Sequence, residues 1–205
     1  MKNYTFTENW FTDDGLSTLN EIEPTEEIHI LEIGSFEGKS TIWFLENFLQ
    51  NKNSTITCVD PWMDYSQDHD SLNSYFREEN EWNLTERKTK EIFLHNIIES
   101  SNSNKVIIRQ GFSDKILPSL ITEQKKYDII FIDGNHTAPY VLSDAIMSWK
   151  LLKVNGIMIF DDYLWELNKP ETLRPKMAVD NFISNYADYL EVIWTDYRMA
   201  IKKIK

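Results

Sequence analysis

Residues 31–41 read LEIGSFEGKST, and they complete an apolar run that begins at Ile28. An apolar, β-branched run that ends in a glycine turn and passes into a helical pattern is typical of the first unit of an α/β domain. The alternation continues, with apolar runs at 28–33, 55–59, 105–109, 127–132 and 156–160 and helical patterns at 38–50, 84–100, 113–123 and 137–152. The sequence therefore predicts a Rossmann-like, doubly wound α/β fold with a mostly parallel sheet.

The C-terminal part of the chain departs from this alternation. A helical pattern at 175–188 is followed by two strand-like runs, LEVIWT at 190–195 and MAIKKI at 199–204, with three residues between them. This spacing is typical of an antiparallel hairpin. Together with the five earlier strands, the hairpin would make a seven-stranded sheet.

The glycine turn fits neither of the common phosphate-binding motifs. A P-loop has four residues between its glycines, whereas Gly34 and Gly38 are separated by three, and Glu37 would place a negative charge beside a phosphate. A P-loop-like nucleotide hydrolase or kinase is therefore disfavoured, although YDIIFID at 127–133 looks like a Walker B strand. The dinucleotide fingerprint fails as well, because Phe36 occupies the position of its second glycine.

What remains is the pattern E-x-G-x-x-x-G, with an acidic residue at the end of the second strand. Glu32 stands two residues before Gly34 and offers a carboxylate to a cationic ammonium group. Asp60 lies 22 residues after Gly38, and an acid near this spacing can accept hydrogen bonds from both ribose hydroxyls. A ligand with an amino acid, a ribose and no phosphate fits this pattern, and S-adenosylmethionine is such a ligand.

Six stretches together resemble the class I S-adenosylmethionine-dependent methyltransferases over about residues 28–205. Within that class the chain looks most like the macrocin O-methyltransferase family, which are metal-dependent sugar O-methyltransferases. The stretches are LEIGSFEGKST, VDPW at 59–62, GFSDKILPSL at 111–120, FIDGNH at 131–136, GIMIFDDY at 156–163 and RPKMAVDNF at 174–182.

The resemblance implies a cofactor site at the ends of the first three strands. Its residues would be Glu32, Gly34, Ser35 and Gly38 for the methionine part, Asp60 for the ribose, and Trp62, Ser113 and Asp114 for the adenine. Two alternatives stay open. Trp62 can instead pack in the core, and Ser113 or Asp114 can instead cap the helix that follows.

Three aspartates follow two neighbouring strands. Asp133 ends the fourth expected strand, and Asp161 and Asp162 end the fifth. Because adjacent strands lie about 4.8 Å apart, we expect the three carboxylates to converge and to require a cation. An all-oxygen site suits Mg²⁺ best, or Mn²⁺ or Ca²⁺, and the resemblance also implies a divalent metal here. In the alternative reading Asp133 contacts the cofactor while Asp161 or Asp162 caps a turn.

Methyl transfer to oxygen needs an activated hydroxyl and a base. The resemblance implies a sugar hydroxyl of a glycoside or glycan as acceptor, oriented by the metal. His136, three residues after Asp133, is the candidate base; Asp133 could do both jobs, and His136 could instead be a helix-start residue bonded to the backbone. A catechol or other phenol is the alternative acceptor. A module that binds the cofactor without turnover is a further alternative.

The amino-acid composition limits the classes of partner that the chain is expected to bind. The net charge of −12, from 33 acidic and 21 basic residues, argues against nucleic acid and leaves a small-molecule or glycan acceptor. No apolar run approaches the roughly 18 residues of a membrane span, and the N-terminus has no signal-peptide pattern. The single cysteine, Cys58, lies in an apolar strand, where we expect a buried thiol. These features lead us to expect a cytoplasmic protein without a membrane partner.

Two segments stand outside the expected scaffold of residues 28–205. Residues 1–27 form an N-terminal extension that could cover the substrate, and residues 61–83 form a long polar and aromatic connection that could act as a lid. A second subunit could also complete the acceptor pocket, which leaves a homo-oligomer open. The candidate sugar-stacking residues are Tyr65, Trp82, Tyr163 and Trp165.

Overall fold

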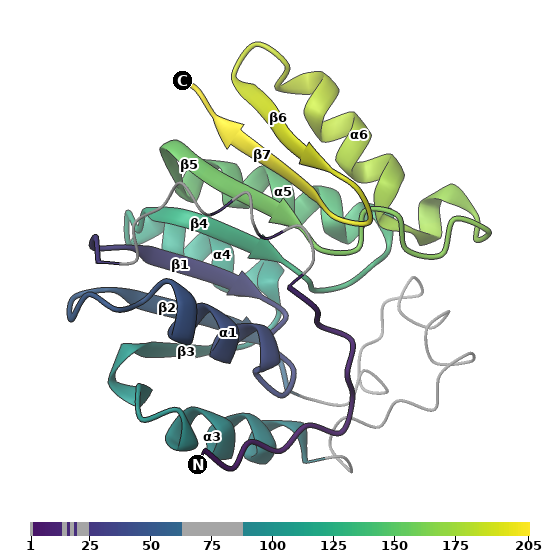
Figure 1. Ribbon diagram of the computed structural model, residues 1–205. Helices are drawn as coiled ribbons and strands as arrows, with labels where there is room; N and C mark the ends of the chain where they lie inside the picture. The colour runs from purple at the N-terminus through teal and green to yellow at the C-terminus, as the bar shows by residue number, and fades with distance from the viewer. Residues whose placement is uncertain (1, 14–15, 17–18, 20–24, 63–87) are drawn as a thin grey trace.

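The computed structural model describes residues 2–13, 16, 19, 25–62 and 88–205. Its centre is a seven-stranded sheet in the order β3-β2-β1-β4-β5-β7-β6 (Figure 1). In chain order the strands are β1 (His29–Ile33), β2 (Thr55–Asp60), β3 (Val106–Gln110), β4 (Tyr127–Ile132), β5 (Leu152–Phe160), β6 (Leu190–Thr195) and β7 (Met199–Lys203). Strands β1 to β5 pair in parallel, and β7 pairs antiparallel with both β5 and β6. The predicted fold is confirmed.

Helices cover both faces of the sheet. The α-helices are α1 (Lys39–Asn47), α3 (Thr89–Glu99), α4 (Ser113–Thr122), α5 (Ala138–Leu151) and α6 (Pro175–Asn185), and two short 3₁₀ helices are η3 (Ser103–Lys105) and η4 (Glu171–Leu173). Buried side chains of α1 and α3 form one hydrophobic cluster with the sheet, and those of α4, α5 and α6 form a second. This three-layer arrangement buries both faces of the central strands, which explains their continuous apolar runs. Cys58 is fully buried in β2, as expected.

The register of the parallel strands brings their carboxyl ends together. Ile33 pairs with Val59 on one side and with Ile132 on the other, and Ile132 pairs with Phe160. The residues that follow these strands therefore meet at one edge of the sheet. They include the glycine turn and the expected acidic residues.

The glycine at the start of the turn is required by its surroundings. Gly34 has a φ of 85°, and its N–H donates to the carbonyl of Val59 over 2.8 Å. A Cβ atom at this position would lie 1.8 Å from the carbonyl oxygen of Asp133. The close approach of the β1 turn to the end of β4 thus depends on the absence of a side chain.

Strand β5 differs from the expectation. It begins at Leu152, directly after α5, rather than at 156. Leu152 pairs with Tyr127, and the pairing then shifts through a bulge before Ile129 meets Ile157. A bulge breaks the apolar pattern at its extra residues, which is why the first part of the strand was not predicted.

The candidate lid and the start of the helical pattern at 84–100 fall largely outside the residues that the structure describes. The candidate lid at 61–83 lies outside the described residues except for Pro61 and Trp62, and α3 is described from Thr89 onward. Among the helices that the structure describes, none has the length and apolar character needed to span a membrane.

Candidate functional site

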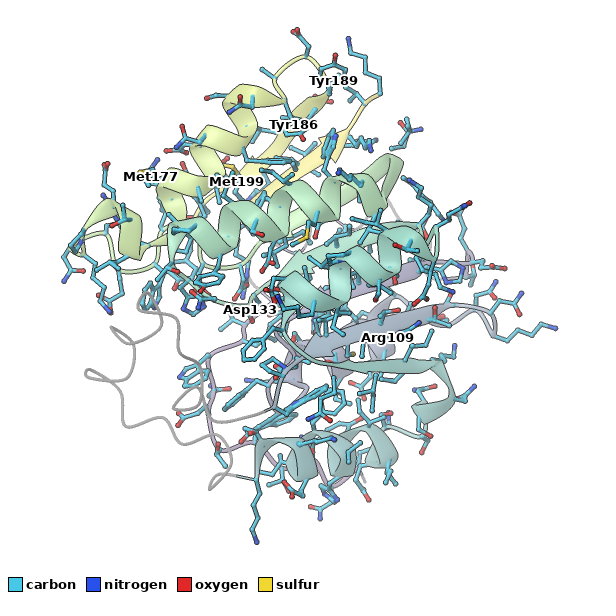
Figure 2. All side chains as sticks on the ribbon, turned by 180° about the vertical axis from the view of Figure 1, so that it is seen from behind. Arg109, Asp133, Met177, Tyr186, Tyr189 and Met199 are labelled. Carbon is cyan, nitrogen blue, oxygen red and sulfur yellow. The ribbon has the colours of Figure 1, made fainter. Side chains whose placement is uncertain are left out.

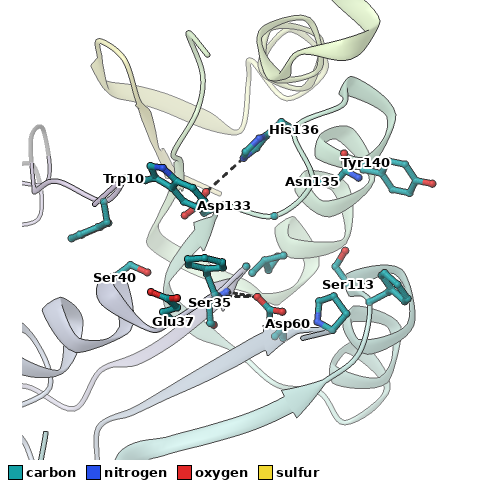
Figure 3. A pocket seen from close by; sticks show the side chains of 18 of the residues that line it. Trp10, Ser35, Glu37, Ser40, Asp60, Ser113, Asp133, Asn135, His136 and Tyr140 are labelled. Carbon is teal, nitrogen blue, oxygen red and sulfur yellow. Dashed lines mark hydrogen bonds and ion pairs between the residues drawn. The ribbon is translucent and has the colours of Figure 1, made fainter. Parts of the chain in front are cut away.

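A pocket of about 450 Å³ opens at the carboxyl edge of the sheet (Figure 3). The glycine turn forms its floor, with Asp60 on one side and Asp133 and His136 on the other. The beginning of α4 and part of the N-terminal segment complete the lining. The pocket therefore joins the turn that was expected to hold a cofactor to the expected catalytic pair.

Asp60 is tied to the glycine turn by backbone hydrogen bonds. One carboxylate oxygen accepts from the N–H groups of Ser35 and Phe36, each over 2.9 Å, and the other accepts from the N–H of Trp62 over 2.7 Å. Burial raises the pKa of Asp60, and the three N–H donors partly offset that rise by favouring the carboxylate. Asp60 still lines the pocket, so it can hold the turn and face a ligand at the same time.

Glu32 lies beneath the turn and is fully buried. Its carboxylate accepts hydrogen bonds from the hydroxyls of Ser35 (2.6 Å), Ser40 (2.7 Å) and Thr41. Burial raises its pKa, and the hydroxyl donors oppose the rise. Ser35 and Ser40 line the pocket and Glu32 does not, so the contact of Glu32 with a cofactor stays a prediction. Its hydrogen bonds join the turn to the start of α1.

The N-terminal segment 2–13 contributes contacts that the sequence did not reveal. Thr7 donates its N–H (2.6 Å) and its hydroxyl (2.5 Å) to the buried carboxylate of Glu37. The ring of Trp10 packs against that of Phe36 with centroids 5.0 Å apart. In Figure 1 this purple segment runs from α3 past α1 to the carboxyl ends of the central strands. The aromatic residues of YTFTENWF were the available signal, since such density is unusual in a solvated tail.

The residues expected at the adenine take different positions. Trp62 is buried, donates its indole N–H to the carbonyl of Phe36 over 2.8 Å, and packs on Phe93 with centroids 4.7 Å apart. The packing alternative thus describes Trp62, and the flat surfaces that line the pocket near Asp60 come from Pro61 and Phe112.

Ser113 and Asp114 line the pocket at the beginning of α4. The residue before the helix is Phe112, and no side chain caps it, so the capping alternative is wrong. The Ser113 hydroxyl instead bonds to the buried carboxylate of Asp144 in α5. Asp114 pairs with Lys115 over 2.9 Å. Both residues remain available to an adenine edge as a prediction.

Asp133, His136 and Asp162 form a compact group at the other end of the pocket. One ligand atom from each lies within 4.8 Å of the other two. The Nε2 atom of His136 is 2.9 Å from Asp162 and 3.8 Å from Asp133, the latter drawn as a dashed line in Figure 3. His136 lies two residues before α5, and its ring nitrogen faces the two carboxylates.

Asp161 does not belong to this group. Its carboxylate accepts from the guanidinium of Arg198, and both side chains are almost fully buried. Asp162 lies outside this ion pair, and its Oδ2 is 2.9 Å from the Nε2 of His136. The structure thus brings His136 and Asp162 to Asp133, whereas the carboxylate of Asp161, the third expected ligand, is paired with Arg198. Which of these residues bind a metal stays a prediction.

Residues 31–163 match a family model described as a methyltransferase domain, which is more than half of the chain. The chain belongs to this methyltransferase family. An uncharacterised protein of Acanthamoeba polyphaga mimivirus is 27% identical over 171 residues, which are 82% of this chain and 67% of that protein.

Solved structures resemble the methyltransferase in fold. The O-methyltransferase from Bacillus cereus in complex with SAH has a TM-score of 0.63 at 16% identity. The match covers 96% of this chain and 84% of the Bacillus cereus chain. The O-methyltransferase TomG from Streptomyces achromogenes, in complex with SAM, has a TM-score of 0.64 at 17% identity and covers 93% and 78%. At these identities the likeness establishes the shared fold.

Electrostatics couple the members of the Asp133–His136–Asp162 group in this methyltransferase. Burial, and then the charge of Asp161, raise the pKa of Asp133 well above its ordinary value. Burial lowers the pKa of His136, but the charges of Asp162 and Asp133 outweigh it and raise this pKa to about 10. Burial raises the pKa of Asp162, but the imidazolium of His136 outweighs burial and lowers the pKa of Asp162 to about 2. His136 is thus held protonated by the carboxylates.

The group fits a divalent cation. Two carboxylates and one imidazole offer ligand atoms that lie within 4.8 Å of one another. Burial and then the charge of Asp161 raise the pKa of Asp133, and a cation would offset the second of these effects. The imidazole changes the expected donor set, because nitrogen suits Mn²⁺, Fe²⁺ or Zn²⁺ better than Mg²⁺. A site that included His136 would therefore have a mixed oxygen and nitrogen donor set, in place of the expected all-oxygen one.

Of the four aromatic residues expected at the acceptor, two lie within the described chain. Trp165 packs against His136 with ring centroids 4.8 Å apart, which places it beside the candidate catalytic group. Tyr163 is buried, donates its hydroxyl to Asp180 over 2.9 Å and accepts from Lys176, so it serves the packing of α6. Tyr65 and Trp82 lie outside the described residues.

Proposed function

We propose that this methyltransferase transfers a methyl group from S-adenosylmethionine to a hydroxyl of a small acceptor, with a sugar hydroxyl of a glycoside or glycan as the acceptor class. The observation that carries the proposal is the shape of one pocket, in which Asp60 and the glycine turn lie opposite Asp133 and His136. A cofactor bound along the turn would direct its sulfonium toward the second pair.

The cofactor assignment rests on the turn and its acid. Asp60 is fixed by three backbone N–H groups and faces the pocket, so its oxygens are preorganised to accept from ribose hydroxyls. Pro61 and Phe112 offer flat apolar surfaces to the adenine on the same side. The two related O-methyltransferase structures contain SAH and SAM, which supports the same ligand class here.

The acceptor end rests on Asp133, His136 and Asp162. These residues would hold a divalent cation, whose charge would orient the acceptor hydroxyl and lower its pKa. Asp133 lines the pocket and could also accept the proton. His136 can accept a proton only once the charge of the two carboxylates is balanced, because they hold it as the imidazolium. The base is therefore His136 or Asp133, and the metal set is Asp133 and Asp162 with or without His136.

Trp165 favours an acceptor with a flat face. A ring beside His136 can stack on the apolar face of a sugar or on a phenol, so a catechol or other phenol is the second candidate acceptor.

The test is methyl transfer from S-adenosylmethionine to a panel of glycosides and phenols, followed as S-adenosylhomocysteine release. We expect turnover with at least one glycoside, loss of turnover after chelation, and recovery with Mn²⁺ or Mg²⁺. Asp162→Asn should lower turnover more than 100-fold, while Asp188→Asn, an exposed aspartate near α6, should leave it unchanged. Turnover with phenols but with no glycoside would show that the acceptor is a phenol and not a sugar hydroxyl. Binding of ATP but not of S-adenosylhomocysteine would overturn the whole proposal.

A further inference from the structure

The turn between β6 and β7 is hydrogen-bonded to the loop that follows β5. Arg198 donates to Asp161, and the hydroxyl of Tyr197 donates to Asp162 over 2.8 Å. The carbonyl of Tyr197 accepts from the N–H of Leu164 over 3.0 Å. Two of these contacts reach the adjacent aspartates that follow β5, and the third reaches the backbone of Leu164.

The pairing of β7 with β5 determines the position of this turn. Strand β7 pairs with β5, and in that pairing Met199 lies opposite Phe160. Arg198 and Tyr197 immediately precede Met199, so the register brings them beside Asp161 and Asp162 without further adjustment. The turn therefore has a defined position relative to the aspartates.

The two contacts sort the aspartates into different environments. Asp161 is buried against Arg198, which compensates its charge. Asp162 receives Tyr197 on Oδ1, and its Oδ2 lies 2.9 Å from His136. The terminal torsion of an aspartate is broad, so a carboxylate with one oxygen anchored is held in one orientation that a free carboxylate would not keep. Tyr197 thereby turns Oδ2 toward Asp133 and His136.

We propose that Tyr197 is a positioning residue for the metal-binding carboxylate of Asp162, and that Arg198 keeps Asp161 out of the metal site. The inference rests on the proposed function, since it concerns the cation that Asp133, His136 and Asp162 would hold. Partners of ligand carboxylates commonly change metal affinity by about 10- to 100-fold when they are removed.

The structure also separates this role from a purely structural one. Tyr197 is about half exposed, with 47% of its surface open. Deleting its hydroxyl buries no unsatisfied group in the core, and Asp162 keeps its contact with His136. A change at Tyr197 should consequently alter metal affinity while leaving the melting temperature within about 2 °C of the wild type.

The experiment is a Mn²⁺ titration of the full chain, with bound ion followed by electron paramagnetic resonance. We expect Tyr197→Phe to weaken binding by about 10-fold and Asp162→Asn by at least 30-fold. Tyr189→Phe is the matched control: Tyr189 is similarly exposed and lies far from Asp133 in Figure 2, so its affinity should stay within twofold. The Kd for S-adenosylhomocysteine should be the same in the tyrosine variants.

A second set of variants tests the role proposed for Arg198. Arg198→Lys keeps a cation beside Asp161 and should retain Mn²⁺ affinity within about threefold, and Asp161→Asn should lower the melting temperature while affinity changes less than in Asp162→Asn. If wild type binds Mn²⁺ and Tyr197→Phe binds it equally well, the positioning role is overturned and the proposed function stands. If wild type binds no Mn²⁺, the metal part of the proposed function fails together with this inference. Equal losses in Asp161→Asn and Asp162→Asn would show that both aspartates are ligands.

Discussion

Thr7 donates both its backbone N–H and its hydroxyl to the carboxylate of Glu37, at 2.6 and 2.5 Å. This contact joins the N-terminal segment to the glycine turn, because Glu37 lies between Phe36 and Gly38. Glu37 is almost fully buried, so the two donors satisfy a carboxylate that has little access to water. This pair is one of the contacts that hold the segment beside the pocket.

Removing the Thr7 hydroxyl should loosen the segment. We expect Thr7→Val to raise the Kd for S-adenosylhomocysteine by about 5- to 10-fold, because a hydrogen bond to a charged group contributes about 1.5–3 kcal/mol, and part of it is kept by the N–H. Isothermal titration calorimetry measures the change. Thr5→Val is the control, since Thr5 bonds to Asn96 through its backbone. Equal affinities in the two variants would show that the Thr7 hydroxyl is not needed to hold the segment over the pocket.

Asp60 should be the most sensitive residue on the cofactor side. Asp60→Asn leaves one oxygen where two now accept three N–H groups, and it turns an amide toward one of the donors. We expect the Kd for S-adenosylhomocysteine to rise by more than 10-fold and the free energy of unfolding to fall by about 1–3 kcal/mol. Calorimetry and urea unfolding give the two values. A Kd within twofold of wild type would exclude Asp60 as the ribose ligand.

Gly34 should tolerate no side chain. Gly34→Ala places a Cβ 1.8 Å from the Asp133 carbonyl oxygen at a φ of 85°, so β1 and β4 must move apart. We expect a loss of about 3 kcal/mol or more in the free energy of unfolding. Gly134→Ala is the matched control, because its nearest neighbour would be a side-chain carbon of Ile33 at 3.3 Å. Urea unfolding of both variants should show the control within about 1 kcal/mol of wild type.

Asp144 should make stability depend on pH. Burial raises its pKa to about 7 from an ordinary value of 3.8, although the Ser113 hydroxyl opposes the rise. The folded chain then binds this proton more tightly than the unfolded chain. The contribution of Asp144 is fully present below about pH 4 and is lost as pH rises through 7.

Asp144→Asn removes this dependence by imitating the protonated acid. We expect the free energy of unfolding of Asp144→Asn, relative to wild type, to increase by about 2–4 kcal/mol between pH 4 and pH 8. Urea unfolding at both pH values gives the difference, and the exposed Asp188→Asn should show no such trend. A constant difference between Asp144→Asn and wild type would contradict the raised pKa.

The strands and the acidic residues at their ends were predictable because both are local. Buried parallel strands read as apolar runs, and the residue after such a run must lie at the carboxyl edge of the sheet. Asp60 and Asp133 were therefore located correctly from the sequence, and both line the pocket. The start of β5 was not, because a bulge interrupts its pattern.

The side-chain partners were not predictable because they come from distant parts of the chain. Asp161 and Asp162 are adjacent and chemically identical, and only Arg198 and Tyr197, more than 30 residues later, distinguish them. Trp62 reads as a pocket aromatic, yet Phe93 provides a better apolar surface for it. A single sequence shows which residues reach the edge of the sheet, but the direction of each side chain is decided by what packs beside it.

The guanidinium of Arg198 also lies 5.4 Å from the centre of the Phe11 ring. Phe11 lines the pocket from the N-terminal segment, whereas Arg198 precedes the strand β7. During synthesis the first of these residues emerges from the ribosome long before the second. The contact between Phe11 and Arg198 can therefore form only after translation has passed β7, so Phe11 gains this partner late in synthesis.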